Sequence, residues 1–353
     1  MDSPGKKWLT GLSLQQLTEV AAEAGLKRFA GAQISDWLYA KFAGEIDEMT
    51  NIPLHARKTL NDKYEVGRIG PGQTAISADG TKKYVFPTGG GRSIETVYIP
   101  DGERGTLCIS SQAGCRMGCQ FCMTARGGYG HNLTSGEIIN QIAAIPEREG
   151  LTNIVFMGMG EPLDNLDNVL DSIEIMTSQW GFGWSPTRIT LSTIGILPAL
   201  KAAVERTKIH IAVSLHNPFG AERAAMMPAQ KAFPISEVLK LLRQYDFSHQ
   251  RRLSFEYIMF DGINDTPRHL KELAKVLRGL DCRVNLIRFH AIPDCELKGS
   301  PDDRIRDFNT ALNKAGILTT TRSSRGEDIL AACGMLAGSQ GLIAAKGCFI
   351  GRN

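Results

Sequence analysis

The segment GCRMGCQFCMTARGG spans residues 114–128 and places three cysteines within eight positions. Cys115, Cys119 and Cys122 follow a CxxxCxxC spacing, which lets thiolates in a loop converge on one side. Three thiolates bind three irons of a four-iron, four-sulfur cluster and leave the fourth iron open to a ligand. Structural zinc is the alternative, but zinc sites usually pair two CxxC or HxxxH units, and the nearest downstream histidine, His131, lacks that spacing. The motif therefore favours an iron–sulfur cluster with an open coordination position.

Strand-like and helix-like patterns alternate along the chain from residue 104 onward. Six apolar runs of strand length occur at residues 106–111, 153–158, 188–193, 210–215, 253–260 and 283–289. Most of the intervals between them have helical periodicity, and this alternation predicts parallel β/α units. Six units are too few for a closed eight-fold barrel. We therefore expect an α/β fold with an open, partial (β/α)6 barrel and its functional residues on the loops that follow the strands.

The N-terminal part has a different pattern. Amphipathic helices are predicted at residues 13–24, 34–43 and 53–63, and the runs KKYVFPT and RSIETVYIP on either side of a glycine turn predict a β-hairpin. We divide the chain into a small helical accessory domain, a hairpin extension, the barrel core and a C-terminal segment, at residues 1–75, 76–103, 104–332 and 333–353. Because its helical segments carry scattered Lys and Arg, we expect the accessory domain to bind RNA.

Composition excludes some classes of protein. The chain has 353 residues, 42% of them hydrophobic, and a net charge of only +3, which by itself does not indicate a nucleic-acid partner. Its N-terminus lacks the apolar region of a signal peptide, and no later run is long and apolar enough to span a membrane. Eight cysteines in such a chain favour metal or redox chemistry over structural disulfides. We expect a cytoplasmic protein without a membrane partner.

Six further stretches carry a family resemblance. The segments TLCISSQAGCRMGCQFCMTA, FMGMGEPLDN, LSTIGI, VSLHNP, GINDT and AACGMLAG resemble, in this order, the RlmN/Cfr family of radical S-adenosylmethionine (SAM) rRNA adenine methyltransferases. The resemblance is closest to an RlmN-like subgroup, and it implies a radical SAM barrel that methylates C2 of adenine 2503 in 23S rRNA and of adenine 37 in tRNA. Methylation at C8, as in Cfr-like enzymes, is one alternative. A non-enzymatic iron–sulfur protein is another.

The resemblance also assigns cofactors and partners. It implies a [4Fe-4S] cluster on the three clustered cysteines, with the methionine part of SAM on the open iron and two SAM molecules per turnover. The residues that match SAM contacts of the family are Gly160, Glu161, Ser192, Ser214, Leu215, His216 and His290, the last at a position where many relatives carry Asn. Expected partners are the two RNAs and a low-potential electron donor such as flavodoxin or ferredoxin, and the expected state is a monomer.

Three catalytic residues follow from the resemblance alone. By their own patterns, Cys108 and Cys333 are typical of buried packing residues, and Glu95 of an exposed strand position. In the family, the cysteine matching Cys333 carries a methyl group from a first SAM. The residue matching Glu95 is the proposed base that removes the C2 proton, and the thiol matching Cys108 releases the RNA by forming a disulfide bond with Cys333.

Overall fold

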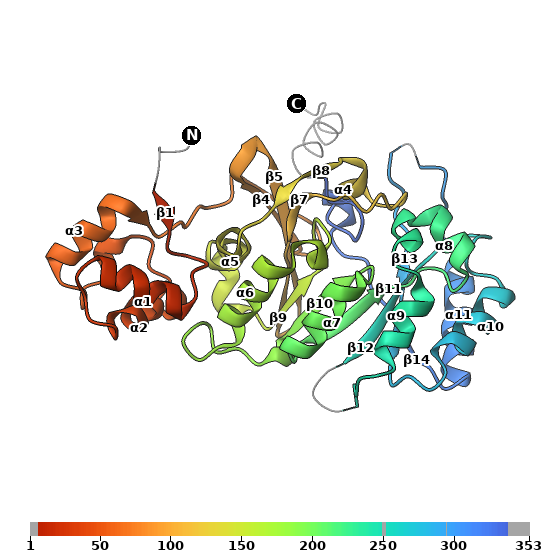
Figure 1. Ribbon diagram of the computed structural model, residues 1–353. Coiled ribbons are helices and arrows are strands. Elements are labelled where there is room, and N and C mark those ends of the chain that lie inside the picture. Colours follow the sequence, from red (N-terminus) through yellow and green to blue (C-terminus); the bar gives the residue numbers. More distant parts are fainter. Residues whose placement is uncertain (1–5, 249–251, 294, 338–353) are drawn as a thin grey trace, which may run out of the picture.

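A ten-stranded mixed sheet forms the centre of the computed structural model, which describes residues 6–248, 252–293 and 295–337 (Figure 1). From one edge to the other, the strands are β14 (Leu318–Thr321), β13 (Arg283–Arg288), β12 (Leu253–Met259), β11 (His210–Ser214), β10 (Ile189–Thr193), β9 (Asn153–Phe156), β6 (Arg104–Cys108), β5 (Ser93–Asp101), β4 (Lys82–Pro87) and β3 (Gln73–Ile76).

All six predicted barrel strands form and pair in parallel, from β6 through β9 to β13. The sequence analysis missed β14, which pairs in parallel with β13 and adds a seventh strand at the edge. Three of its four residues are threonines and three are exposed, so it has no apolar run to reveal it. The partial barrel is confirmed, with one strand more than expected.

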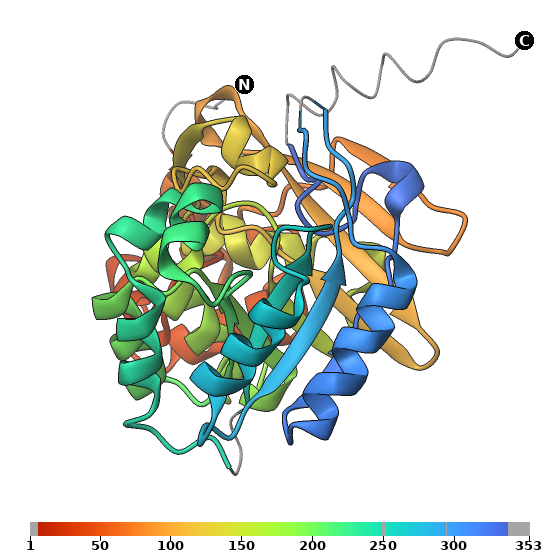
Figure 2. The same cartoon turned by 90° about the vertical axis from the view of Figure 1, so that its right-hand side faces the viewer.

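Helices follow the parallel strands and cover the outer side of the curved sheet (Figures 1 and 2). The helices of this part are α4 (Met123–Arg126), α5 (Ser135–Ala143), α6 (Leu166–Thr177), α7 (Leu197–Arg206), α8 (Gly220–Met226), α9 (Ile235–Leu242), α10 (Pro267–Leu277) and α11 (Asp302–Lys314). Local sequence explains their starts. Thr134 and Glu137 form a capping box at α5, and proline stands in the first turn of α7 and α10.

The N-terminal region is mainly helical, as predicted. It contains α1 (Leu14–Glu23), α2 (Ala30–Ser35) and α3 (Leu54–Lys63), together with the paired strands β1 (Lys7–Trp8) and β2 (Tyr64–Glu65). The second predicted helix differs in detail, because α2 is short and continues as a π-helical turn over Asp36–Ala40. Short 3-10 turns occur at Ile46–Glu48, Gly89–Gly91, Pro146–Gly150, Pro162–Asn165, Pro186–Arg188, Pro228–Lys231 and Glu327–Ile329.

The N-terminal region packs against α5 and the loop after α6. A side chain at Gly11, which has φ 94°, would place its Cβ 2.2 Å from the backbone nitrogen of Gly136, so the two segments approach as closely as glycine allows. The ring of Tyr39 lies 6.0 Å from those of Trp180 and Phe182. The apolar residues of this region belong to the same buried cluster as the barrel core.

The predicted hairpin forms from β4 and β5, which pair antiparallel. It is extended by β3 and joins the barrel sheet through antiparallel pairing of β5 with β6. A separate small sheet of β7 (Gln112–Gly114) and β8 (Tyr129–Asn132), which the sequence analysis did not anticipate, brackets the cysteine loop. In the part of the chain that the structure describes, the helices are too short or too polar to cross a membrane.

Candidate active site

A cavity lies among the loops that follow the parallel strands. Nine of the residues singled out in the sequence line it, from five segments of the chain: Cys115, Cys119, Cys122, Gly160, Glu161, Ser192, Ser214, His216 and Cys333. Parallel strands end at the same side of a sheet, so residues far apart in sequence meet there. The sequence-based placement of the site is thus consistent with the fold.

The three clustered cysteines occupy the loop between β7 and α4. Burial raises the pKa of Cys115 to about 12 and raises that of Cys119 further, so both thiols hold their protons until a metal replaces them. Within the described residues, no three His, Cys, Asp or Glu side chains are close enough together to hold a single metal ion. Three thiolates that share one cavity but bind separate irons fit the donor set of a [4Fe-4S] cluster.

Arg223 supplies a positive charge beside this loop. Its side chain is only 1% exposed, and its guanidinium donates to the backbone oxygens of Ile194, Ser214 and Leu215 at 3.2, 2.8 and 3.0 Å. It therefore ties the end of β10 to the end of β11. Burial lowers the pKa of Arg223 to about 10, which leaves it charged at neutral pH, and its electrostatic interaction with Cys119 favours the thiolate.

Gly160 and Glu161 form the turn after β9. Gly160 has φ 99°, and a Cβ there would lie 2.5 Å from Cβ of Gln112, so both backbone shape and space require glycine. The Glu161 carboxylate accepts hydrogen bonds from Oγ1 of Thr193 at 2.6 Å and from the backbone nitrogen of Ile194 at 3.0 Å. Burial raises the pKa of Glu161 to about 7. The turn thus presents a buried carboxyl group to the cavity.

Ser192 and Ser214 lie at the carboxyl ends of β10 and β11, and His216 lies two residues after the end of β11. Burial, followed by the charge of Arg223, lowers the pKa of His216 to about 3, so the imidazole is neutral. Its Nδ1 accepts a hydrogen bond from the backbone nitrogen of Ile258 at 3.0 Å, and this places the ring proton on Nε2. The cavity therefore has a hydrogen-bond donor at this point.

Two of the seven residues that match SAM contacts of the family do not line the cavity. Leu215 is fully buried, and its backbone nitrogen donates to the oxygen of Glu256 at 3.1 Å. The imidazole of His290 contacts Oγ of Ser324 at 3.0 Å and Oε1 of Glu327 at 3.2 Å. Both ring nitrogens of His290 are thus engaged with the segment that leads toward Cys333.

Cys333 reaches the cavity because the C-terminal segment packs against α4. The backbone nitrogen of Met123 donates to the oxygen of Gly334 at 2.8 Å, and Oγ1 of Thr124 donates to the oxygen of Leu336 at 2.6 Å. Cys333 faces the open cavity and is exposed, although the protein around it raises its thiol pKa. Residues 338–353, the rest of the predicted C-terminal segment, lie outside the described residues.

Cys108 lies at the end of β6, behind the cavity wall. Burial and then the interaction with Cys333 raise the pKa of Cys108 to about 12, so the two sulfurs are near enough to influence each other. Both are free thiols. The disulfide bond expected between them as a reaction intermediate is therefore not present in this structure.

Glu95 corrects one expectation. The sequence pattern predicts an exposed strand residue at this position. In the structure Glu95 is only 2% exposed, because the C-terminal segment covers it. Its Oε2 accepts a hydrogen bond from the backbone nitrogen of Ala337 at 3.1 Å, and its Oε1 lies 3.5 Å from Nζ of Lys83. The contact at Ala337 places this carboxylate beside the segment that carries Cys333.

Two charged residues were missed by the sequence analysis. Glu256, on β12, lines the cavity; its Oε1 accepts from Asn285 at 2.7 Å, and its buried Oε2 has no partner among the described residues. Arg322, directly after β14, lies 3.3 Å from Glu256 and interacts electrostatically with both Cys108 and Cys333. A charged residue inside the otherwise apolar run LSFEYIM was the available signal for Glu256.

A partial β/α barrel with three clustered cysteines after its first strand, and a carboxyl-bearing glycine turn after its second, defines the radical SAM class of enzymes. Comparison with known families agrees. Residues 109–277 match the model of the radical SAM superfamily, and residues 8–66 match the model described as the ribosomal RNA large subunit methyltransferase N-terminal domain.

Similar proteins extend this match to nearly the whole chain. A probable dual-specificity RNA methyltransferase RlmN from Bacteroides thetaiotaomicron is 54% identical over 93% of this chain and 95% of its own length. The dual-specificity RNA methyltransferase RlmN of Marinobacter nauticus is 40% identical over 94% and 92%. A solved radical SAM methyltransferase from Sphaerobacter thermophilus superposes with a TM-score of 0.88, at 38% identity, over 93% of this chain and 98% of that one.

The chain belongs to the RlmN family of radical SAM RNA methyltransferases. It is therefore an enzyme whose cofactors are a [4Fe-4S] cluster and SAM. The alternative of a non-enzymatic iron–sulfur protein is thereby set aside.

Proposed function

We propose that this enzyme methylates C2 of adenine in 23S rRNA, at the position equivalent to adenine 2503, and in tRNA, at adenine 37. The observation that carries the proposal is the position of Cys333, which lines one cavity together with three cysteines some 200 residues earlier in the chain. An iron–sulfur site for SAM and a separate nucleophilic thiol at one cavity are the two parts that methyl transfer through cysteine requires. The relatives described above bear the RlmN name, so C8 methylation is not favoured.

Cys115, Cys119 and Cys122 are the proposed ligands of the cluster, which supplies the electron that cleaves SAM reductively. In the same proposal, Glu161 accepts a hydrogen bond from the ammonium of SAM, and Ser192, Ser214 and His216 contact the rest of the molecule. Leu215 acts through its backbone, and His290 acts from the outer edge of the site.

Cys333 is the proposed methyl acceptor. Its thiolate attacks the methyl group of a first SAM, so one C–S bond forms, another breaks, and S-adenosylhomocysteine leaves. One electron from the cluster would split a second SAM into methionine and a 5′-deoxyadenosyl radical, and this radical would take a hydrogen atom from the S-methyl group of Cys333. The resulting methylene carbon then bonds to C2 of adenine, an electron-poor carbon that does not attack a methylsulfonium itself.

Release of the product needs a base and a second thiol. The adduct radical would return one electron to the oxidised cluster, and Glu95 takes the C2 proton. The Cys108 thiolate then attacks the sulfur of Cys333; the S–S bond forms, and the electron pair of the broken C–S bond takes a proton to complete the methyl group. Two electrons from a cellular reductant reopen this disulfide.

The partners proposed from the family are the two RNAs and a flavodoxin or ferredoxin as electron donor. We propose that the protein acts as a monomer in the cytoplasm, where its RNA substrates are. Residues 1–75 serve as an RNA-binding module in this proposal, residues 76–103 as its link to the core, residues 104–332 as the radical SAM core, and residues 333–353 as the segment that carries the methylated cysteine.

The test is a nucleoside digest of 23S rRNA and tRNA from a deletion strain, with and without this gene restored. Restoration should return 2-methyladenosine to both RNAs, whereas the Cys333→Ala gene should not. Appearance of 8-methyladenosine would instead assign Cfr-like chemistry, and absence of either nucleoside would refute methylation of these RNAs.

A further inference from the structure

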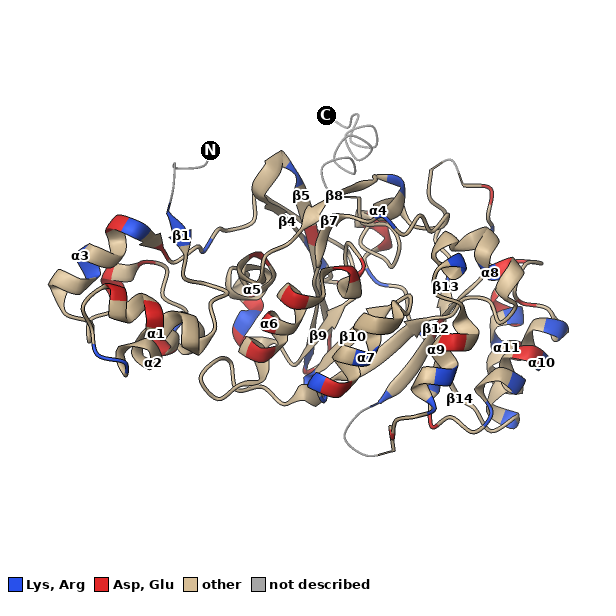
Figure 3. Ribbon diagram, viewed as in Figure 1, with Lys and Arg blue, Asp and Glu red and all other residues tan. Residues whose placement is uncertain are grey.

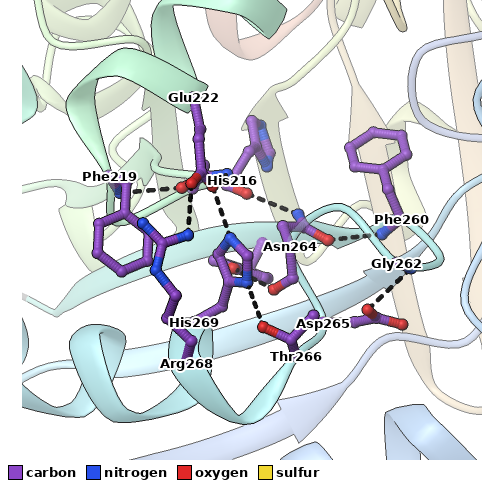
Figure 4. A network of polar contacts seen from close by, with 12 residues as sticks. His216, Phe219, Glu222, Phe260, Gly262, Asn264, Asp265, Thr266, Arg268 and His269 are labelled. Atoms are coloured by element: carbon purple, nitrogen blue, oxygen red, sulfur yellow. Dashed lines mark hydrogen bonds and ion pairs between the residues drawn. The ribbon is translucent and has the colours of Figure 1, made fainter.

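Asn264, in the GINDT segment, has no role in the function proposed above, yet it is fully buried and densely bonded. Its side-chain nitrogen donates to the backbone oxygens of His216 at 2.6 Å and of Ile258 at 2.7 Å. Its side-chain oxygen accepts from the backbone nitrogen of Phe260 at 2.7 Å. One side chain therefore joins the end of β11 to the end of β12 and the loop beyond it (Figure 4).

The backbone of His216 needs such support. Its φ is 53°, in the left-handed region that residues with a Cβ seldom adopt, so surrounding contacts must hold it there. The hydrogen bond from Asn264 to the His216 oxygen fixes the peptide immediately after this residue.

Asn264 also fixes the ring of His216 indirectly. The backbone of Ile258 donates through its N–H to Nδ1 of His216 and accepts from Asn264 through its oxygen. The imidazole is further packed edge-on against Phe121, within the cysteine loop, at 5.1 Å between ring centres. The ring is thus oriented by neighbours on both sides, with Nε2 left as the donor.

A second brace supports the same two loops farther from the cavity. Glu222 accepts from Nδ2 of Asn217 at 3.1 Å and contacts Nε2 of His269 at 2.6 Å, and the other ring nitrogen of His269 contacts Thr266 at 2.7 Å (Figure 4). Arg268 pairs with the same carboxylate at 2.6 Å. This brace holds the two loops together, but none of its hydrogen bonds involves His216. It therefore stabilises the loops without itself setting the conformation of His216.

We propose that Asn264 is a positioning residue for SAM, which acts by holding His216 in its left-handed backbone conformation and in the tautomer that donates from Nε2. The inference rests on the proposed contact of His216 with SAM. It assigns a function to the GINDT segment, in which Asn264 secures the part of the cavity wall that His216 and Ile258 form.

The experiment uses full-length protein labelled with 15N in its histidine rings, and it reads the tautomer of His216 by NMR. His216→Ala identifies the signal. In wild-type protein the signal should be that of the Nε2–H tautomer, and an Nδ1–H signal would overturn the proposal at once. Asn264→Ala and Asn264→Asp both remove the two donated hydrogen bonds, and Asp keeps the acceptor for Phe260, so each should give a mixture of tautomers.

The matched control is Tyr257→Phe. The hydroxyl of Tyr257 donates to the backbone oxygen of Asn264 at 2.7 Å, so this variant also loses a buried hydrogen bond at the loop but leaves His216 untouched. It should lower the melting temperature while keeping the Nε2–H tautomer. If it shifts His216 as much as the Asn264 variants do, the effect is general loosening, and the proposal fails.

SAM affinity of the cluster-loaded protein is the second measurement. Asn264→Asp should raise the Kd of SAM by about tenfold, as loss of one well-placed hydrogen bond implies, while Tyr257→Phe should leave it unchanged. An Asn264 variant with wild-type tautomer and wild-type affinity refutes the proposal. If His216→Ala binds SAM normally, the proposed contact of His216 with SAM is wrong instead, and the NMR result still decides whether Asn264 holds His216.

Discussion

Nη2 of Arg322 lies 3.3 Å from Oε1 of Glu256, at the wall of the cavity where Cys333 is exposed. The arginine enters from the end of an edge strand, and its charge opposes the rise in the pKa of both Cys108 and Cys333 that desolvation by the surrounding protein causes. Both proposed thiol reactions begin with a thiolate: that of Cys333 in the first step and that of Cys108 in the last. The charge of Arg322, held in place by Glu256, therefore favours both steps of the proposed reaction.

Replacement of Arg322 by Gln should therefore slow methylation of Cys333. Loss of the cation raises the thiol pKa, and one pKa unit reduces the thiolate fraction about tenfold at neutral pH. The added mass of one CH2 group on the Cys333 peptide, followed over time after SAM addition, measures the rate. Arg322→Lys is the control, because it keeps the charge. Equal rates in the Gln variant and the wild type would contradict this role.

Anaerobic reconstitution should load about four irons and four sulfides per chain. Replacement of Cys115, Cys119 and Cys122 together by Ala should abolish both the iron and the visible absorbance of the cluster. Cys282→Ala, which changes a half-buried thiol away from the cavity, should load normally. Full loading of the triple variant would show that the cluster ligands lie elsewhere.

Cys108→Ala should stop the reaction after the adduct has formed, leaving RNA covalently attached to Cys333. The physical reason is that a thioether to the modified base needs a second thiol to release it. Denaturing gels with labelled RNA measure the complex. The double variant Cys108→Ala, Cys333→Ala should trap nothing. Normal turnover by Cys108→Ala would return Cys108 to a packing role.

SAM affinity should weaken as the pH falls through about 7. Burial raises the pKa of Glu161 to about 7, so below that value the carboxyl is protonated and cannot pair with the ammonium of SAM. The Kd of SAM should then rise by up to about tenfold per pH unit.

Calorimetric titration of cluster-loaded protein at several pH values provides the measurement. Glu161→Gln should bind weakly and lose this pH dependence. Glu147→Gln, which changes a carboxylate that is paired with Lys82 and does not line the cavity, should keep it. An unchanged Kd across this range in the wild type would exclude an ionic contact at Glu161.

The proposed RNA-binding role of the N-terminal region is best tested by charge reversal, because this region shares the buried core and its removal would expose that core. Figure 3 shows Lys and Arg interspersed with acidic residues there and along α10 and α11. Reversal of exposed Lys27 and Arg28 to Glu should weaken RNA binding and reduce the slope of log affinity against log salt by about one to two.

Arg306 and Lys314, both exposed on α11, provide the matched control when reversed in the same way. That variant should bind RNA with the salt slope of the wild type. SAM cleavage without RNA should be unaffected in both variants. If the two reversals weaken binding equally, the N-terminal region has no special part in RNA recognition.

Elements whose signals are local could be predicted from the amino-acid sequence. The CxxxCxxC spacing, the glycine turn at Gly160, the apolar strand runs and the hairpin around Gly89–Gly91 can each be recognised within a few residues, and the structure contains all of them. The polar edge strand β14 and the small sheet β7–β8 were not recognised, because neither has an apolar run long enough to stand out.

Which of these segments come together in space could not be predicted from the sequence and is seen in the folded structure. The return of the C-terminal segment across α4 buries Glu95 and places Cys333 at the cavity, and the pairing of β13 with both β12 and β14 brings Arg322 to Glu256. The position of Asn264 beneath His216 likewise depends on two loops that are 48 residues apart. Periodicity records which face of an element is apolar, but contacts between distant segments depend on how the whole core packs, and local sequence carries no direct signal of that.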